Sequence, residues 1–126
     1  MTTPLIKSYE ASAAIGANRI VVFSDVAASS KVATAAAATT PAIGVSGPLG
    51  AAIGEMCDVT LGGLAQLKLG GTVNAGGPIM SDANGAGIAA VAAAATTRRV
   101  VAFALEPGVS GDLIWVNVNP SLLDRA

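Results

Sequence analysis

The sequence predicts an all-β protein, either a small β-barrel or a β-sandwich of short strands. Three observations predict this class. Runs rich in valine, isoleucine and aromatic residues recur, apolar residues alternate with small polar ones, and glycine- and proline-rich turns follow about every eight to twelve residues. At most one short helix is expected.

Residues 1–18 are expected to form an irregular N-terminal arm. They show no clean periodicity, and Pro4 disfavours a helix around it. The arm nevertheless carries Leu5, Ile6 and Tyr9, apolar side chains that a purely solvated tail would not need. We therefore predict an arm that is either mobile or docked on a partner.

A single β-domain is predicted over residues 19–126. RIVVFSD is a β-branched run typical of a strand, whereas KVATAAA fits a strand or a helix because alanine suits both. EMCDVTL and LAQLKL both show alternation, and the Gly62-Gly63 pair between them predicts a hairpin. These four runs occupy residues 19–25, 31–37, 55–61 and 64–69, and a further short strand enters a Gly-Pro turn within residues 41–50.

The C-terminal half contains the clearest strands and one ambiguous stretch. RVVAFAL at residues 99–105 and DLIWVNV at residues 112–118 are predicted strands, joined by EPGVSG. Asn84-Gly85 predicts a type I′ hairpin turn, which needs positive φ at both central positions. Residues 88–97 are alanine-rich and fit either a helix or a strand.

A weak internal repeat runs through the chain at an offset of 57 residues. Several motifs recur in one register without gaps, although alanine-rich chains also match themselves by chance. A pseudo-duplicated β unit is therefore a hypothesis. The recurring motifs are AAAATT at residues 35–40 and 92–97, Ser24-Asp25 and Ser81-Asp82, and Gly54-Glu55 and Gly111-Asp112.

Composition limits the functions open to this chain. Its 126 residues are 52% hydrophobic but only 3% aromatic, so we expect a thin core that gains stability from a partner or from oligomerisation. Trp115 lies in a strongly apolar strand and is expected to belong to this core. A formal net charge of −1 leaves no basic patch, so no nucleic-acid partner is expected. The longest apolar run, residues 85–95, is far shorter than the roughly 20 residues that span a bilayer, so no membrane partner is expected.

No catalytic, cofactor or metal site is predicted, and the chain is expected not to be an enzyme. It has no histidine, which removes the usual general base and the commonest metal ligand. Cys57, the single cysteine, is expected to be a small core residue. Asp82 begins a segment that lacks the further oxygen ligands of a calcium loop, so Asp82, like Asp25, is expected to bond within a turn.

Four segments, taken in order, form a series. They are GANRIVVFSD, PAIGVSGPLGAAIGEMCDVTL, NAGGPIMSDANGAG and RVVAFALEPGVSGDLIWVNVNP. This series resembles the capsid decoration (cement) proteins of tailed bacteriophages, which share an iGV strand, a GE..DV strand, an aGgp..sdanG.a segment and a closing vvaaAle....Gd.i.V.v.P segment. The resemblance covers about residues 11–120 and departs from the family pattern at Phe103, where a small residue is common.

The resemblance implies a structural protein of the virion, located on the outer surface of the capsid and made in the host cytoplasm. Such proteins bind expanded heads and stabilise them by bridging major capsid subunits, commonly as homotrimers whose N-terminal arms grip the shell. The major capsid protein is therefore the expected partner. The expected capsid-contacting residues are Thr2, Pro4, Leu5, Ile6 and Tyr9.

Two other classes stay open. The chain could be another virion or tail component, such as a fibre base, built from the same β-modules. It could also be a small β-barrel binding module unrelated to viruses, in which case a pocket with convergent polar groups is expected.

Overall fold

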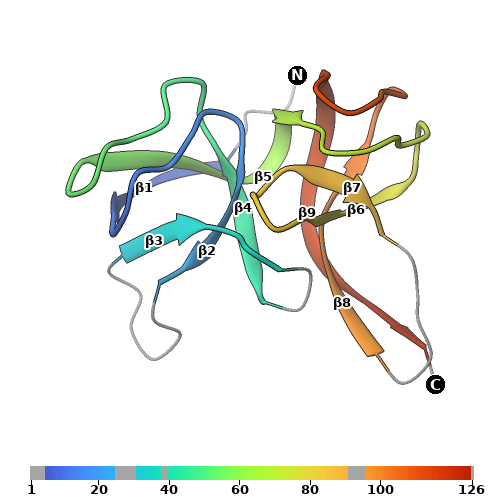
Figure 1. Cartoon of the computed structure of the whole chain (residues 1–126), viewed down its shortest axis with the longest axis horizontal. Helices are drawn as coiled ribbons and strands as arrows, with labels where there is room; N and C mark the ends of the chain where they lie inside the picture. The colour runs from blue at the N-terminus through green and yellow to red at the C-terminus, as the bar shows by residue number, and fades with distance from the viewer. Residues whose placement is uncertain (1–4, 25–30, 38–39, 91–95, 126) are drawn as a thin grey trace.

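The computed structural model describes residues 5–24, 31–37, 40–90 and 96–125, and within these ranges it contains strands and no helix. The predicted all-β class is confirmed. The strands follow the β-branched and aromatic runs of the sequence. They are β1 Leu5–Ala11, β2 Ile20–Phe23, β3 Lys31–Thr34, β4 Ala42–Ser46, β5 Met56–Lys68, β6 Pro78–Ser81, β7 Gly87–Ala89, β8 Thr96–Ala104 and β9 Leu113–Arg125 (Figure 1).

Five strands close a first barrel, on the left of Figure 1. They lie in the order β1, β3, β2, β4 and β5, and β1 also pairs with β5, which closes the ring. Part of the expected N-terminal arm is therefore a barrel strand, because β1 takes residues 5–11. The buried apolar residues inside this barrel are Tyr9, Ala11, Ile15, Val21, Val32, Cys57 and Val59.

Strand β5 runs without interruption for 13 residues through the Gly62-Gly63 pair. The hairpin predicted there is wrong. Leu5 pairs with Gly62, whereas Gly63, with a φ of 92°, pairs with Val118 of β9. Because glycine tolerates this backbone conformation, the strand can pass from one set of neighbours to the next without reversing.

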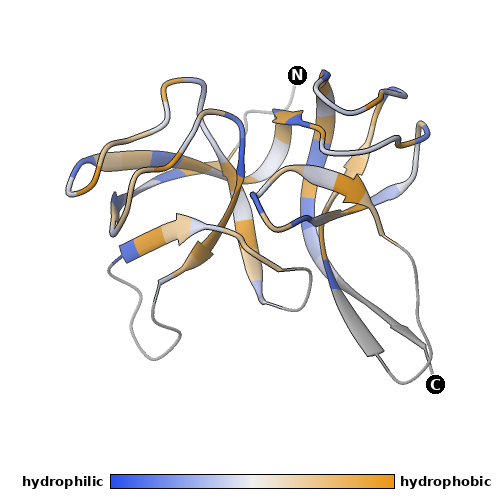
Figure 2. Ribbon diagram, viewed as in Figure 1, coloured by the Kyte–Doolittle hydropathy of each residue, from blue (hydrophilic) through white to orange (hydrophobic). Residues whose placement is uncertain are grey.

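The second half of β5 opens a second ring of strands. It pairs with β9, which is followed by β8, β6 and β7, and a parallel bridge between Leu69 and Gly87 links β7 back to the end of β5. Leu67, Ile79 and Ile114 are buried in the core of this ring. Figure 2 shows hydrophobic segments on the strands of both barrels.

The two rings repeat one topology. The pairings of β2 with β3, β2 with β4 and β4 with β5 recur as β6 with β7, β6 with β8 and β8 with β9, and β5 and β9 begin and end 57 positions apart. A turn repeats in detail, because the Ala52 N–H donates to Glu55 Oε1 at 2.9 Å and the Val109 N–H donates to Asp112 Oδ2 at 3.0 Å. These features support the duplication hypothesis at the predicted offset.

Equivalent core positions are filled by different apolar residues in the two rings. Tyr9 pairs with Cys57 between β1 and β5, and Leu67 pairs with Ile114 between β5 and β9. The second half of β5 therefore occupies the same place in the second ring that β1 occupies in the first. The chain is therefore two tandem barrels that share one long strand.

The loop at Asn84-Gly85 differs from the predicted type I′ turn. It covers residues 82–86 between β6 and β7, and of the two central residues only Gly85 has a positive φ, of 75°. Asp82 Oδ1 accepts the N–H groups of Asn84 and Ala86 at 2.8 and 3.0 Å, which confirms the turn role predicted for Asp82. Asp25 lies outside the described residues.

The alanine-rich stretch at residues 88–97 begins and ends in strands. Its first two residues belong to β7 and its last two to β8, whereas residues 91–95 lie outside the described ranges. The chain therefore enters and leaves this stretch in extended form.

Cys57 is a core residue, as predicted. It is fully buried on β5, opposite Tyr9. Burial raises the pKa of the Cys57 thiol, and the neighbouring Asp58 carboxylate raises it further. The thiol is therefore kept protonated and inert in the folded protein.

The raised pKa of Cys57 predicts a loss of stability at alkaline pH. The unfolded chain releases the thiol proton near the ordinary pKa of about 8.5, while the folded chain retains it to higher pH. The unfolded state then binds fewer protons, so the free energy of unfolding falls above about pH 8.5. Urea unfolding from pH 7 to 10 should show a steeper fall for the wild type than for Cys57→Ala, and equal slopes would contradict the assignment.

Candidate functional site

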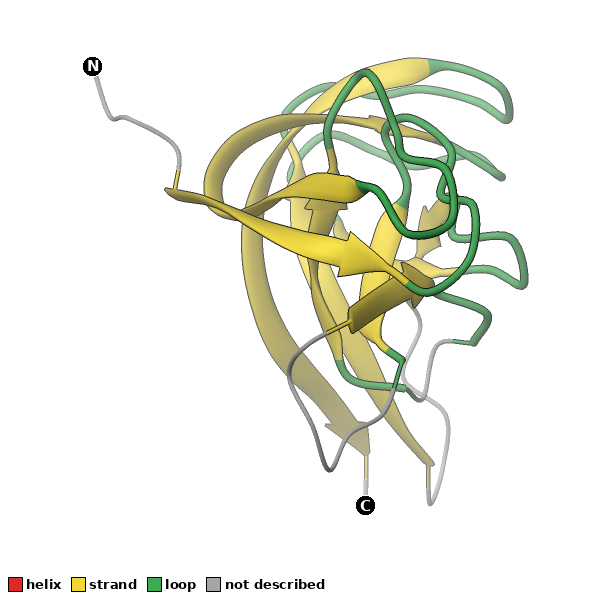
Figure 3. Cartoon of the chain, turned by 90° about the vertical axis from the view of Figure 1, so that its left-hand side faces the viewer, coloured by secondary structure: helices red, strands yellow, loops and turns green. Residues whose placement is uncertain are grey.

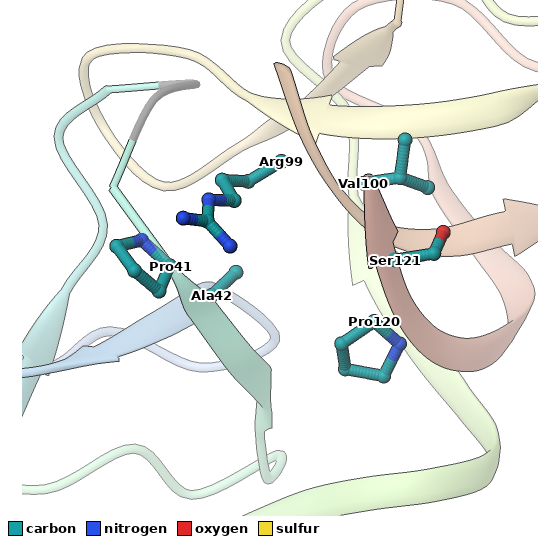
Figure 4. Close-up of a pocket in the computed structure, with 6 residues that line it drawn as sticks. All are labelled: Pro41, Ala42, Arg99, Val100, Pro120 and Ser121. Carbon is teal, nitrogen blue, oxygen red and sulfur yellow. The ribbon is translucent and has the colours of Figure 1, made fainter. Parts of the chain in front are cut away.

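A shallow cleft of about 200 Å³ lies between the start of β4 and the strands β8 and β9 (Figure 4). In Figure 4 the Arg99 side chain extends toward Pro41, and Ser121 lies on the far side of the cleft. A guanidinium stays protonated and cannot act as a base, and the residues lining the cleft include no carboxylate that could activate the Ser121 hydroxyl. The cleft therefore offers no acid–base pair.

The described ranges also show no cluster of metal-ligating side chains. Among those residues no group of three histidine, cysteine, aspartate or glutamate side chains could hold a metal ion. The described ranges also contain no helix long and apolar enough to cross a membrane. The feature of the described residues that stands out is a set of large apolar side chains exposed on the surface of the barrels.

Large apolar side chains are exposed on the shared strand β5 and on strands of both barrels around it. Figure 3 shows the long strands curving along one side of the molecule, with most connecting loops on the opposite side. Contiguous exposed apolar groups on a protein surface mark an interaction site. We call the following residues the central patch: Leu5, Ile6, Leu64, Leu105 and Trp115.

Strand pairing places the members of the central patch on or directly after neighbouring strands. Leu5 lies opposite Gly62 and Ile6 opposite Thr60 across β1 and β5. Thr60, Leu64 and Trp115 line one shallow groove of about 230 Å³. The start of β1 therefore lies beside the point where β5 passes from its pairing with β1 to its pairing with β9.

Trp115 is the largest side chain of the patch and is 47% exposed. The prediction that it lies in the core is wrong, because its strand neighbours Ile114 and Val116 take the inward positions and the alternation of a strand sends Trp115 outward. Its backbone is fixed on both sides. The Trp115 N–H donates to Glu106 Oε2 at 3.3 Å, and the Trp115 carbonyl accepts the Leu105 N–H at 3.0 Å.

The five predicted contact residues fall into three groups. Leu5 and Ile6 are exposed, at 64% and 52%, in the central patch. Tyr9 is a core residue and is not available to a partner, because its ring packs edge-on against Phe23 at 5.5 Å inside the first barrel. Thr2 and Pro4 lie outside the described residues.

Leu64 and Leu105 are patch residues that the sequence did not reveal. Leu64 follows the two glycines that were interpreted as a hairpin, so its outward position on a continuous strand was hidden. Leu105 stands just after β8. Alternation along LAQLKL does separate Leu64 from Leu67, but it does not tell which of the two faces is solvent.

The fold and the surface define a class: a small all-β protein of two tandem barrels with an exposed apolar patch over their shared strand. No protein-family model and no curated sequence matches this chain. Among solved structures, it is similar to the N base of the head fiber protein gp8.5 of bacteriophage phi29, with a TM-score of 0.69 and 17% sequence identity. The match covers 93% of this chain and 95% of that one, so the two chains share a fold over nearly the whole of each.

Proposed function

We propose that this chain is a structural protein of a bacteriophage virion. The observation that carries the proposal is the fold shared with a phage head fiber base over 93% of the chain. The ordered motifs that resemble phage decoration proteins point to the same class. An exposed apolar patch on a chain of 126 residues without histidine suits a protein that acts by surface contact.

In its finer form, the proposal is a decoration protein that binds the outer surface of the expanded head and bridges major capsid subunits. The central patch is the proposed contact, with Leu5 and Ile6 at its N-terminal edge and Trp115 as its anchor. Large aromatic side chains that become buried at the centre of an interface contribute most to affinity. A protein that binds only the assembled shell stabilises that shell by mass action.

A homotrimer is the proposed assembly on the head. Three linked central patches would engage several shell subunits at once, so that modest contacts add up to strong binding through avidity. The thin core of the single chain is consistent with a protein that gains stability from such neighbours.

A base for a head fibre is the second candidate, favoured by the name of the structural neighbour. The two roles predict different defects in heads that lack the protein. Heads without a decoration protein should break at lower temperature and shear, whereas heads without a fibre base should keep their strength and lack fibres in electron micrographs.

Adding the purified chain back to heads that lack it tests the proposal. A decoration protein should cosediment with expanded heads and raise the temperature at which they release DNA. A chain that never binds expanded heads, while heads without it have both normal strength and normal fibres, would contradict both candidate roles.

A further inference from the structure

The two ends of β5 carry surfaces of opposite charge. At the start of the strand, Pro48, Leu49, Met56 and Asp58 line a groove of about 210 Å³. Leu49 is 95% exposed, the most exposed large apolar side chain in the described ranges, and Met56 beside it is 61% exposed. We call this surface the acidic end, because Asp58 is the charged residue in its lining.

At the far end of β5 lies a depression of about 400 Å³ whose lining includes Ala17, Arg19, Lys68 and Leu113. Its lining contains two cations and no carboxylate. The nearby Asp112 carboxylate accepts the Val109 N–H at 3.0 Å. We call this surface the basic depression.

The internal repeat relates these two surfaces. Leu113 stands 57 positions after Met56, and both are exposed and apolar. Leu113 pairs with Lys68 across β9 and β5, just as Met56 pairs with Glu10 across β5 and β1. The same site thus carries Glu10, which is ion-paired with Lys31 at 3.3 Å, in the first barrel and Lys68 in the second.

Charge complementarity between these surfaces identifies the occupant of the basic depression. Asp58 and Lys68 stand near opposite ends of β5, but backbone hydrogen bonds between Asp58 and Gly47, between Gly47 and Asn18 and between Asn18 and Lys68 bring the two surfaces close together on one chain. Leu49 is nevertheless 95% exposed, so it does not fill the depression of its own chain. We propose that the acidic end of one copy docks into the basic depression of a second copy of this chain. Leu49 enters the depression against Leu113, and Asp58 faces Lys68 and Arg19.

This contact joins two different surfaces that adjoin on each chain. Two copies making it reciprocally form a two-fold pair, and copies making it head to tail form a ring or an open chain. A closed ring of three would provide the homotrimer proposed above. The groove lined by Leu64 and Trp115 shares Pro48 with the acidic end and Asn18 with the basic depression, so the docking surfaces adjoin the central patch. The docking itself involves copies of this chain and no shell protein. Purified protein alone therefore tests it.

Charge reversal with a compensating swap is the decisive experiment, followed by sedimentation equilibrium. Asp58→Lys and Lys68→Glu should each weaken self-association by at least about tenfold, since like charges brought together at an interface are strongly unfavourable. The double variant carrying both changes should restore association to within about threefold of the wild type, because it recreates the opposite pairing. Lys7→Glu makes the same charge change as Lys68→Glu outside the contact and should leave association unchanged.

Leu49→Ser tests the apolar part of the contact. Because Leu49 is almost fully exposed, its loss should not lower folding stability, yet it should weaken association by about tenfold or more. Ile53→Ser, an exposed change in the same loop, is the matched control. Asp58 also accepts the Ser8 hydroxyl at 2.6 Å, so Ser8→Ala shows how much of the Asp58 effect arises within one chain.

Three results would overturn the docking. The first is a wild type that stays monomeric at about 1 mM, where even contacts of millimolar Kd are populated. The second is a Lys68→Glu variant that associates as the Lys7→Glu control does. The third is a double variant that associates no better than the single variants.

Discussion

Alanine at position 44 should destabilise the first barrel by about 3 kcal/mol or more. Gly44 lies in β4, and a Cβ built there would overlap the backbone carbonyl oxygen of Thr60 and come within 3.0 Å of Val59 Cγ1. Both residues belong to β5, which is paired with β1 on its other edge. Because β5 is paired along both edges, its backbone cannot shift without breaking hydrogen bonds to β1. An alanine at position 44 therefore forces β4 and β5 apart. Urea unfolding measures the loss.

Gly47→Ala is the matched control for this prediction. Its Cβ would meet the Asp58 carbonyl oxygen at 3.6 Å and the Asp58 Cβ at 3.8 Å, which are ordinary contacts. We expect a change in the free energy of unfolding of less than about 1 kcal/mol. Similar losses for the two variants would mean that β4 and β5 are not as closely packed as the structure has them.

Trp115→Ser should weaken binding to expanded heads by about a hundredfold, which corresponds to roughly 2–3 kcal/mol, typical of a tryptophan anchor at an interface centre. The change removes the largest side chain of the central patch. Trp115 is 47% exposed in the isolated protein, so the free energy of unfolding should change far less than the binding. Cosedimentation with heads over a range of protein concentrations measures the affinity.

Val109→Ser controls for a general effect of removing exposed apolar surface. Val109 is 54% exposed in the turn that ends at Asp112, and it does not belong to the central patch. Heads should bind this variant as tightly as the wild type. Equal loss of binding for the two variants would argue against the central patch as the contact.

Local patterns predicted much of the fold. The β-branched run that contains Ile20–Phe23 and the apolar run before Asn119 both form strands where expected, because β-branched and aromatic side chains suit a pleated surface whatever its neighbours. The repeat was also visible, since Gly54-Glu55 and Gly111-Asp112 form the same turn in each barrel.

Features that depend on long-range pairing were not predictable. The Gly62-Gly63 pair is compatible with a hairpin turn or with a bend inside one strand. It forms a bend because Gly62 pairs with Leu5 of β1 and Gly63 pairs with Val118 of β9. Tyr9 looked like a surface anchor because the closure of the barrel by β1 has no local signal. The same limit hid the central patch, whose members come from β1, β5, β9 and the residue after β8.

The position of this chain on an expanded head tests the central claim most directly. Cryo-electron microscopy of heads decorated with the purified protein should show the side of the barrels that carries Leu5, Ile6, Leu64 and Trp115 in contact with the major capsid protein. Decorated heads on which that side faces solvent, with the loops of the opposite side against the shell, would contradict the account.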